Sequence, residues 1–191
     1  MFFRKLAGCV LAVTLLAGCA TAVDKTEVEQ KDNPVKEMHQ EIVKAQALEK
    51  NKPEWYSYED AIMKARKEGK FVMVEFYADW DQWGKKLDKE TFTDPKVVEA
   101  IKAGFVPARI NAEGSGIVVH EMREMTMSEL ADKYGVKNYP SIWFLDKDGQ
   151  KAKLLNGYLP PDSFLVYLKY IKSGKYKDME FEDYVKKGLY K

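Results

Sequence analysis

The sequence predicts an α/β domain with a central mixed β-sheet flanked by helices. Apolar runs of strand length alternate with helical patterns over residues 55–178, as expected when helices cover a sheet. An Asp-Gly turn then joins the last two strands, which makes that pair antiparallel. The chain has 191 residues, 46% of them hydrophobic, enough for one domain whose core needs no disulfide staples.

The first elements are bounded by capping signals. A helix is predicted over residues 34–51, where Val35, Met38 and Ile42 share one face. Ser57 begins a second helix, which Gly69 ends. The run 71–77 is almost entirely apolar, which is typical of a strand buried on both faces.

The remaining elements follow in a regular order. They are a polar helix over 81–90, a helix from Pro95 capped by Asp94, a strand over 105–111, a helix from the capping box Thr126–Glu129 to near Gly135, strands over 141–145 and 151–155, and a long helix from Pro161. Residues 114–125 form a loop in which 117–119 predict a short strand or a docked turn. A binding loop and a packed loop are both compatible with this segment. The charged residues at the end predict a short docked helix.

The N-terminus has the pattern of a secretory signal peptide. Residues 1–18 have a basic start and an apolar segment too short for a comfortable membrane span. The ending Leu16-Ala17-Gly18-Cys19 resembles the bacterial lipobox, which implies cleavage before Cys19 and lipidation of its thiol and amine. An uncleaved anchor and an ordinary signal peptide are the alternatives. We expect residues 19–33 to be a tether and 34–54 to be an amphipathic helix with its linker.

Lipidation would place the protein in the bacterial cell envelope, facing the periplasm. Ala20 after the lipidated residue is compatible with outer-membrane sorting under the enterobacterial rule. Removal of residues 1–18 would leave 29 basic and 30 acidic residues from the original 31 and 30. This balance does not indicate a basic face for nucleic acid. The expected partners are the membrane, through the lipid, and an envelope protein or peptide.

The stretch from Lys70 to Trp83 resembles the active-site strand and turn of the thioredoxin family. That family has an aromatic residue, Ala, any residue, Trp, and then two cysteines separated by two residues. Here the segment reads Phe76-Tyr-Ala-Asp-Trp80-Asp-Gln-Trp-Gly84, so Asp81, Gln82, Trp83 and Gly84 stand where the redox motif would be. The two cysteines of the chain are Cys9 and Cys19. By the lipobox resemblance the first is discarded and the second is blocked, so no free thiol would remain.

Later motifs extend the resemblance over residues 55–178, which leaves 179–191 as a C-terminal tail. They are Leu130–Val136, Tyr139-Pro140, Phe144–Gly149 and Gly157-Tyr158 with the helix that follows. The last part is similar to SoxW-type periplasmic thioredoxins. The resemblance implies that Pro140 follows a cis peptide bond, in a groove where the family binds extended substrates.

The degenerate site allows more than one interpretation. Trp80, Trp83, Tyr139 and Pro140 predict an apolar patch that either binds a protein or peptide or simply packs the domain edge. Glu75 matches the buried carboxylate of thioredoxins, and burial should raise its pKa. We expect it to be a structural group paired with a lysine or water. A non-redox enzyme that uses Asp81 and Glu75 is a further alternative.

No cofactor or metal is predicted. The pair Asp79 and Asp81 lacks a third ligand at a suitable spacing, and His39 and His120 are expected to be separate surface residues. Thiol–disulfide exchange requires a thiolate. We therefore predict a lipid-anchored protein with a redox-inactive thioredoxin-like domain that binds a partner. Oxidoreductase activity by family analogy is the alternative.

Overall fold

The structure is a computed structural model that describes residues 34–50 and 52–190. The predicted signal segment 1–18, the tether 19–33 and Cys19 lie outside the described residues. A four-stranded sheet forms the centre in the order β2-β1-β5-β6. Its strands are β1 (Phe71–Tyr77), β2 (Phe105–Asn111), β5 (Ser141–Leu145) and β6 (Lys151–Asn156). β2 runs parallel to β1, whereas β5 and β6 are antiparallel to their neighbours, so the sheet is mixed as predicted.

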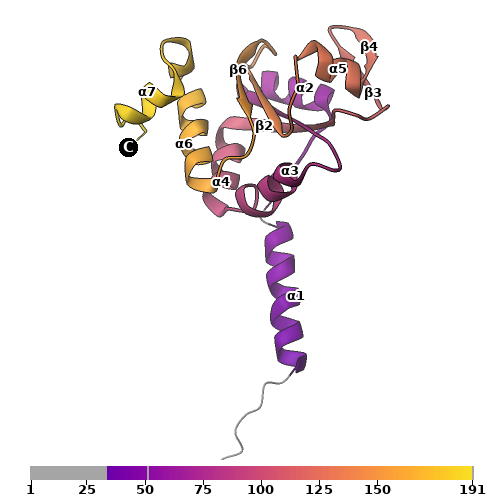
Figure 1. Cartoon of the computed structure of the whole chain (residues 1–191), viewed down its shortest axis with the longest axis vertical. Coiled ribbons are helices and arrows are strands. Elements are labelled where there is room, and N and C mark those ends of the chain that lie inside the picture. The colour runs from indigo at the N-terminus through magenta and orange to yellow at the C-terminus, as the bar shows by residue number, and fades with distance from the viewer. Residues whose placement is uncertain (1–33, 51, 191) are drawn as a thin grey trace, which may run out of the picture.

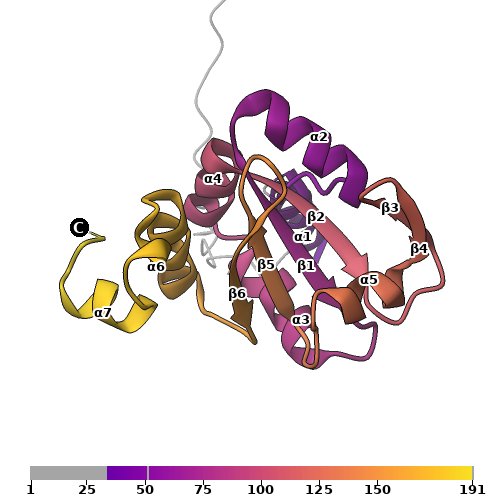
Figure 2. The ribbon, with the colours of Figure 1, turned by 90° about the horizontal axis from the view of Figure 1, so that it is seen from above.

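Helices cover both faces of this sheet (Figure 2). They are α2 (Tyr58–Glu68), α3 (Gln82–Lys86), α4 (Pro95–Gly104), α5 (Met127–Lys133) and α6 (Pro161–Lys172), and α7 (Phe181–Lys186) packs against α6 on the side away from the sheet. Side chains of Val72 and Val74 in β1 pack in one core with α2 and α5. Met73 points to the other face and packs in a second core with α4, α6 and α7. This alternation is the period of two expected of a strand, and both faces are apolar because both are covered.

The predicted capping residues bound the helices. The Ser57 side chain accepts a hydrogen bond from the Asp60 N–H at the start of α2, and Gly69 ends that helix with a φ of 67°. Asp94 caps α4 through the N–H groups of the next turn, and Thr126 forms the expected capping box with Glu129 at α5. Each cap satisfies backbone donors that a helix leaves without partners in its first turn.

Residues 87–91 differ from the predicted regular helix. The segment Leu87–Thr91 is a π-helix that continues directly from α3. Leu87 and Thr91 are both fully buried, and the Thr91 hydroxyl donates a hydrogen bond of 2.7 Å to the carbonyl of Leu159. Side chains four residues apart share a face in an ordinary α-helix as well, so the burial of this pair does not by itself account for the wider turn.

The loop 114–125 forms a separate hairpin of β3 (Ile117–His120) and β4 (Arg123–Thr126). Its two turn residues, Glu121 and Met122, have φ values of 52° and 62°, and Met122 is 96% exposed. The expectation that His120 is a surface residue is wrong. Its side chain is largely buried, and its Nδ1 lies 2.7 Å from the hydroxyl of Tyr58, which fixes the hairpin against α2.

The C-terminal segment packs on the domain. A short 3₁₀ helix over Lys175–Lys177 leads to α7, in which Tyr184 is 2% exposed within the second core. Tyr170 of α6 also donates a hydrogen bond of 2.6 Å to the carbonyl of Met179. The short docked helix expected here is therefore present.

The helix α1 (Pro34–Lys50) matches the predicted N-terminal helix and extends away from the sheet and its covering helices (Figure 1). His39 lies on it and is exposed, as expected. Within residues 34–50 and 52–190, no helix is both long enough and apolar enough to cross a membrane.

Candidate functional site

The turn between β1 and α3 is organised by Asp81. One carboxylate oxygen accepts a hydrogen bond of 2.9 Å from the N–H of Trp83, and the other accepts one of 2.9 Å from the N–H of Gly84. Asp81 is only 4% exposed. At the position of the family's first cysteine the chain thus has a buried helix cap, whose two oxygens are both engaged.

Gly84, at the position of the second cysteine, is required by that cap. A Cβ atom at residue 84 would lie 2.7 Å from the Asp81 Oδ2 atom, closer than a real Cβ comes to another atom. Gly84 therefore leaves the space that the carboxylate occupies. Neither position offers a group that could form a disulfide.

Two exposed aromatic residues flank this cap. Trp80 is 62% exposed and Trp83 is 57% exposed, yet both are held in place. The Trp80 Nε1–H donates to both carboxylate oxygens of Glu113, at 3.1 and 3.0 Å, and its ring lies 5.7 Å from that of Tyr139. Gln82, also exposed, donates a hydrogen bond of 3.3 Å to the carbonyl of Trp80.

Trp83 has a different neighbour from the one expected. Its ring centroid lies 5.8 Å from that of Tyr158, and the Lys86 ammonium sits 5.4 and 4.7 Å from the two ring centroids. Tyr158 was not among the predicted site residues. It follows β6, far from Trp83 in the sequence, and the two residues meet only in the folded domain. We call the two pairs, Trp80 with Tyr139 and Trp83 with Tyr158, the aromatic surface.

Pro140 follows a cis peptide bond, as the resemblance implies. Its side chain is buried, and its carbonyl accepts a hydrogen bond of 2.8 Å from the Gly157 N–H. Pro140 is therefore not part of an exposed patch, whereas Tyr139 before it is half-buried.

Glu75 lies on β1, just below the turn, and is fully buried. Its partner is Arg109 on the adjacent strand β2, so the basic partner is an arginine and not the expected lysine. The Arg109 Nε donates to the Glu75 Oε2 at 2.7 Å, and its Nη2 lies 2.6 Å from the same oxygen. Arg109 also binds Asp88 and lies over the ring of Trp55, 4.3 Å from its centroid.

Burial raises the pKa of Glu75 to about 7, although the Arg109 charge lowers it. Desolvation prevails because the carboxylate loses all contact with water, while Arg109 is shared with a second carboxylate. The Glu75 Oε1 atom has no hydrogen-bond partner. An adjacent cavity of about 190 Å³ is lined by four acidic residues and by Lys85. Near neutral pH Glu75 can hold or release a proton, whereas both oxygens of Asp81 already accept hydrogen bonds from the backbone of the turn.

Metal ligands are not assembled at this site. Among the described residues, no group of three or more His, Cys, Asp or Glu side chains could hold a metal ion. Asp79, considered with Asp81 from the sequence, instead accepts a hydrogen bond of 3.2 Å from Asn111.

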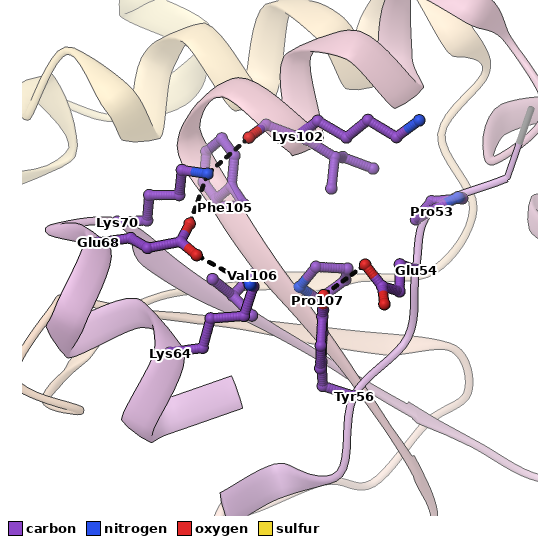
Figure 3. Close-up of a pocket in the computed structure, with 11 residues that line it drawn as sticks. Pro53, Glu54, Tyr56, Lys64, Glu68, Lys70, Lys102, Phe105, Val106 and Pro107 are labelled. Atoms are coloured by element: carbon purple, nitrogen blue, oxygen red, sulfur yellow. Dashed lines mark hydrogen bonds and ion pairs between the residues drawn. The ribbon is translucent and has the colours of Figure 1, made fainter. Parts of the chain in front are cut away.

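A second cavity, of about 280 Å³, lies at the opposite end of the sheet where β1 and β2 begin (Figure 3). Its floor includes Phe105 and Pro107 of β2. On its rim, Glu68 pairs with Lys64 at 2.8 Å and with Lys70 at 2.7 Å. The charges of these three side chains are therefore paired. None of the predicted site residues lines this cavity.

Comparisons with known proteins agree with this architecture. The family model of the thioredoxin-like domain matches residues 58–172. The thiol:disulfide interchange protein DsbD of Colwellia psychrerythraea is 31% identical over 115 residues, which cover 59% of this chain. The chain spans only 16–18% of the length of the first DsbD relatives it matches.

Solved structures show the same fold. A thioredoxin-fold protein from Helicobacter pylori superposes with a TM-score of 0.53 at 28% identity, covering 64% of this chain and 83% of that one. A thioredoxin from Thermus thermophilus gives a TM-score of 0.51 at 27% identity, covering 62% and 86%. Because the family model spans well over half of the sequence, the chain belongs to the thioredoxin-like domain family.

Proposed function

We propose that this chain is a lipid-anchored envelope protein whose thioredoxin-like domain binds an extended segment of another protein without catalysing thiol–disulfide exchange. One observation carries the proposal: two exposed tryptophans flank a turn whose two reactive positions have become a buried carboxylate cap and a glycine. The Asp81 cap holds the turn in place while the thiol chemistry is absent, so recognition is the function that this site can still serve.

The geometry of the aromatic surface supports binding. Large aromatic side chains provide most of the energy at many protein interfaces, especially when they are held in place before the partner arrives. The Glu113 carboxylate holds the Trp80 indole, and Tyr158 with Lys86 holds the Trp83 ring. These contacts reduce the entropy that each ring would lose on binding, while leaving more than half of each tryptophan exposed.

The lack of a thiol argues against the activity named for the DsbD relatives. Exchange proceeds through a thiolate and a mixed disulfide, which neither Asp81 nor Gly84 can form. The lipobox-like segment ending at Cys19 supports export and lipid anchoring, with the domain facing the periplasm and the outer membrane as the expected site. The resemblance of the later motifs to SoxW-type periplasmic thioredoxins is also part of this proposal.

Affinity purification from membranes tests the binding surface. Wild-type protein, Trp83→Ala and a matched control, Met63→Ala, would be compared. Met63 is 63% exposed on α2, outside the aromatic surface. We expect Trp83→Ala to lose a partner that wild type and Met63→Ala both recover. Recovery of the same proteins by all three would reject the binding site.

Insulin reduction tests the absence of redox activity. We expect the wild-type domain to be inactive and the double variant Asp81→Cys/Gly84→Cys to reduce insulin, because the thiols would then occupy an intact turn. The double variant serves as the positive control for folding of the site. Activity of the wild-type protein would overturn the proposal, whatever the variant does.

A further inference from the structure

We infer that α1 forms a parallel two-stranded coiled coil with α1 of a second copy of this chain. The inference goes beyond the binding site, and its parallel orientation rests on the proposed lipid anchor. The starting observation is exposure. Met38, Ile42 and Val43 are 56%, 46% and 50% exposed, and none of residues 35–43 belongs to either described hydrophobic core.

A helix in this situation needs a partner. In water an isolated helix of 17 residues is only marginally stable, and most helical stability in proteins comes from packing of an apolar face. Figure 1 shows α1 extending away from the sheet and its covering helices, so the domain of the same chain does not supply that packing.

The spacing of the apolar residues indicates the partner. Val35, Met38 and Ile42 follow one another at intervals of three and four, and Ala45 continues the series in the sequence. Taken as heptad positions they are a, d, a and d, a narrow seam that fits a second helix of the same kind. The a positions Val35 and Ile42 are β-branched, which favours two strands in a parallel coiled coil.

Charge and composition are compatible with a homodimer. The residues at the e and g positions of this heptad frame include His39, Glu41 and Gln46, so the sequence pairs no like charges across the seam. α1 has no aromatic residue, and acidic residues accompany its lysines. A helix lying on a membrane surface would need a broader apolar face and a basic polar face.

The anchor would fix the orientation. The 14 residues between Cys19 and α1 can span at most about 50 Å when fully extended. Two chains anchored in one membrane leaflet would therefore both have the N-terminus of α1 within that distance of the lipid, which favours a parallel arrangement. Confinement to a membrane also raises the effective concentration of the helices, which favours association of a short seam.

Disulfide cross-linking of the full chain in membranes tests the seam. A single cysteine would be placed at Met38, a d position, or at the control Gln40, an f position on the opposite side. The two native cysteines stay unchanged in both variants. After mild oxidation we expect Met38→Cys to shift on a non-reducing gel to the mass of a dimer, whereas Gln40→Cys stays monomeric. Side chains at d face each other across a parallel seam, and those at f point outward.

A second change separates the seam from chance collision. Adding Ile42→Lys to the Met38→Cys protein should abolish the dimer band, because it places a charge in the seam on an exposed helix face without touching the domain core. Equal cross-linking at residues 38 and 40, no dimer at residue 38, or a cross-link only to a protein of another mass would overturn the proposal.

Labelling with palmitate in the same experiment tests the anchor independently. A labelled monomer would reject the dimer and leave the anchor standing. An unlabelled dimer would support the coiled coil and reject the anchor, and with it the stated reason for the parallel orientation. Binding through the aromatic surface is measured by the Trp83→Ala comparison and does not enter either outcome.

Discussion

Replacing Glu75 with Gln should remove a specific part of the pH dependence of stability. In the folded protein burial raises the pKa of Glu75 from 4.5 to about 7. Between these values the folded state keeps a proton that the unfolded state has released. The free energy of unfolding must then fall as pH rises through this window, and the contribution of Glu75 is complete below pH 4.5 and lost above pH 7.

The size of the effect follows from the two pKa values. At 1.36 kcal/mol for each pKa unit, the change from 4.5 to about 7 is worth about 3 kcal/mol. Glu68 cannot imitate this slope, because its two lysine partners lower its pKa to about 2, so it titrates only at more acidic pH. Burial lowers the pKa of His120, which gives a slope of the opposite sign. The difference between wild type and Glu75→Gln therefore isolates Glu75.

Urea unfolding at several pH values between 4 and 8 provides the measurement. The wild-type free energy of unfolding should fall relative to that of Glu75→Gln by about 3 kcal/mol across the window. Glu68→Gln, which removes an exposed carboxylate, is the control. Above pH 4.5 its free energy of unfolding should change with pH in parallel with that of wild type. Parallel profiles for wild type and Glu75→Gln would show that the buried carboxylate titrates normally, and the burial argument would be wrong.

Three further substitutions test the local geometry by urea unfolding. Gly84→Ala should destabilise the fold by about 1–3 kcal/mol through overpacking against Asp81; the loss should shrink in the double variant Asp81→Ala/Gly84→Ala, and simple additivity would contradict the predicted clash. Tyr184→Ala should cost about 3–5 kcal/mol, as removal of a large buried ring does; a change below about 1 kcal/mol would show that α7 is not part of the cooperative core. Met122→Gly should stabilise the fold by up to about 1 kcal/mol, because glycine adopts the left-handed φ without strain; a loss of stability there would refute the strain argument.

Much of the fold could be predicted because its signals are local. The caps at Ser57, Asp94 and Thr126, the apolar run of β1 and the Asp-Gly turn each depend on residues close in sequence. The same is true of the cis peptide bond at Pro140, which the family resemblance implied. The mixed sheet flanked by helices was expected from these elements and from their resemblance to thioredoxin-like sequences, whereas the strand order comes from the structure.

What the sequence did not reveal depends on contacts between distant segments. Arg109 meets Glu75 only because β2 pairs with β1 in parallel register, which puts the two residues side by side. His120 is buried because its hairpin folds back onto Tyr58, 62 residues earlier. Tyr158 joins the aromatic surface in the same way. The sequence around such a polar or aromatic residue does not indicate which distant residue it contacts.

The contact between the Asp81 carboxylate and the backbone of Gly84 also bears on how this site could change over generations. A return to a dithiol needs two substitutions. If Gly84→Cys came first, its side chain would meet the carboxylate at the 2.7 Å approach. If Asp81→Cys came first, the turn would lose its carboxylate cap and the protein would carry one thiol without a partner at residue 84. Both single intermediates are disadvantageous, so a cysteine pair at this turn is harder to acquire than a count of two codons suggests.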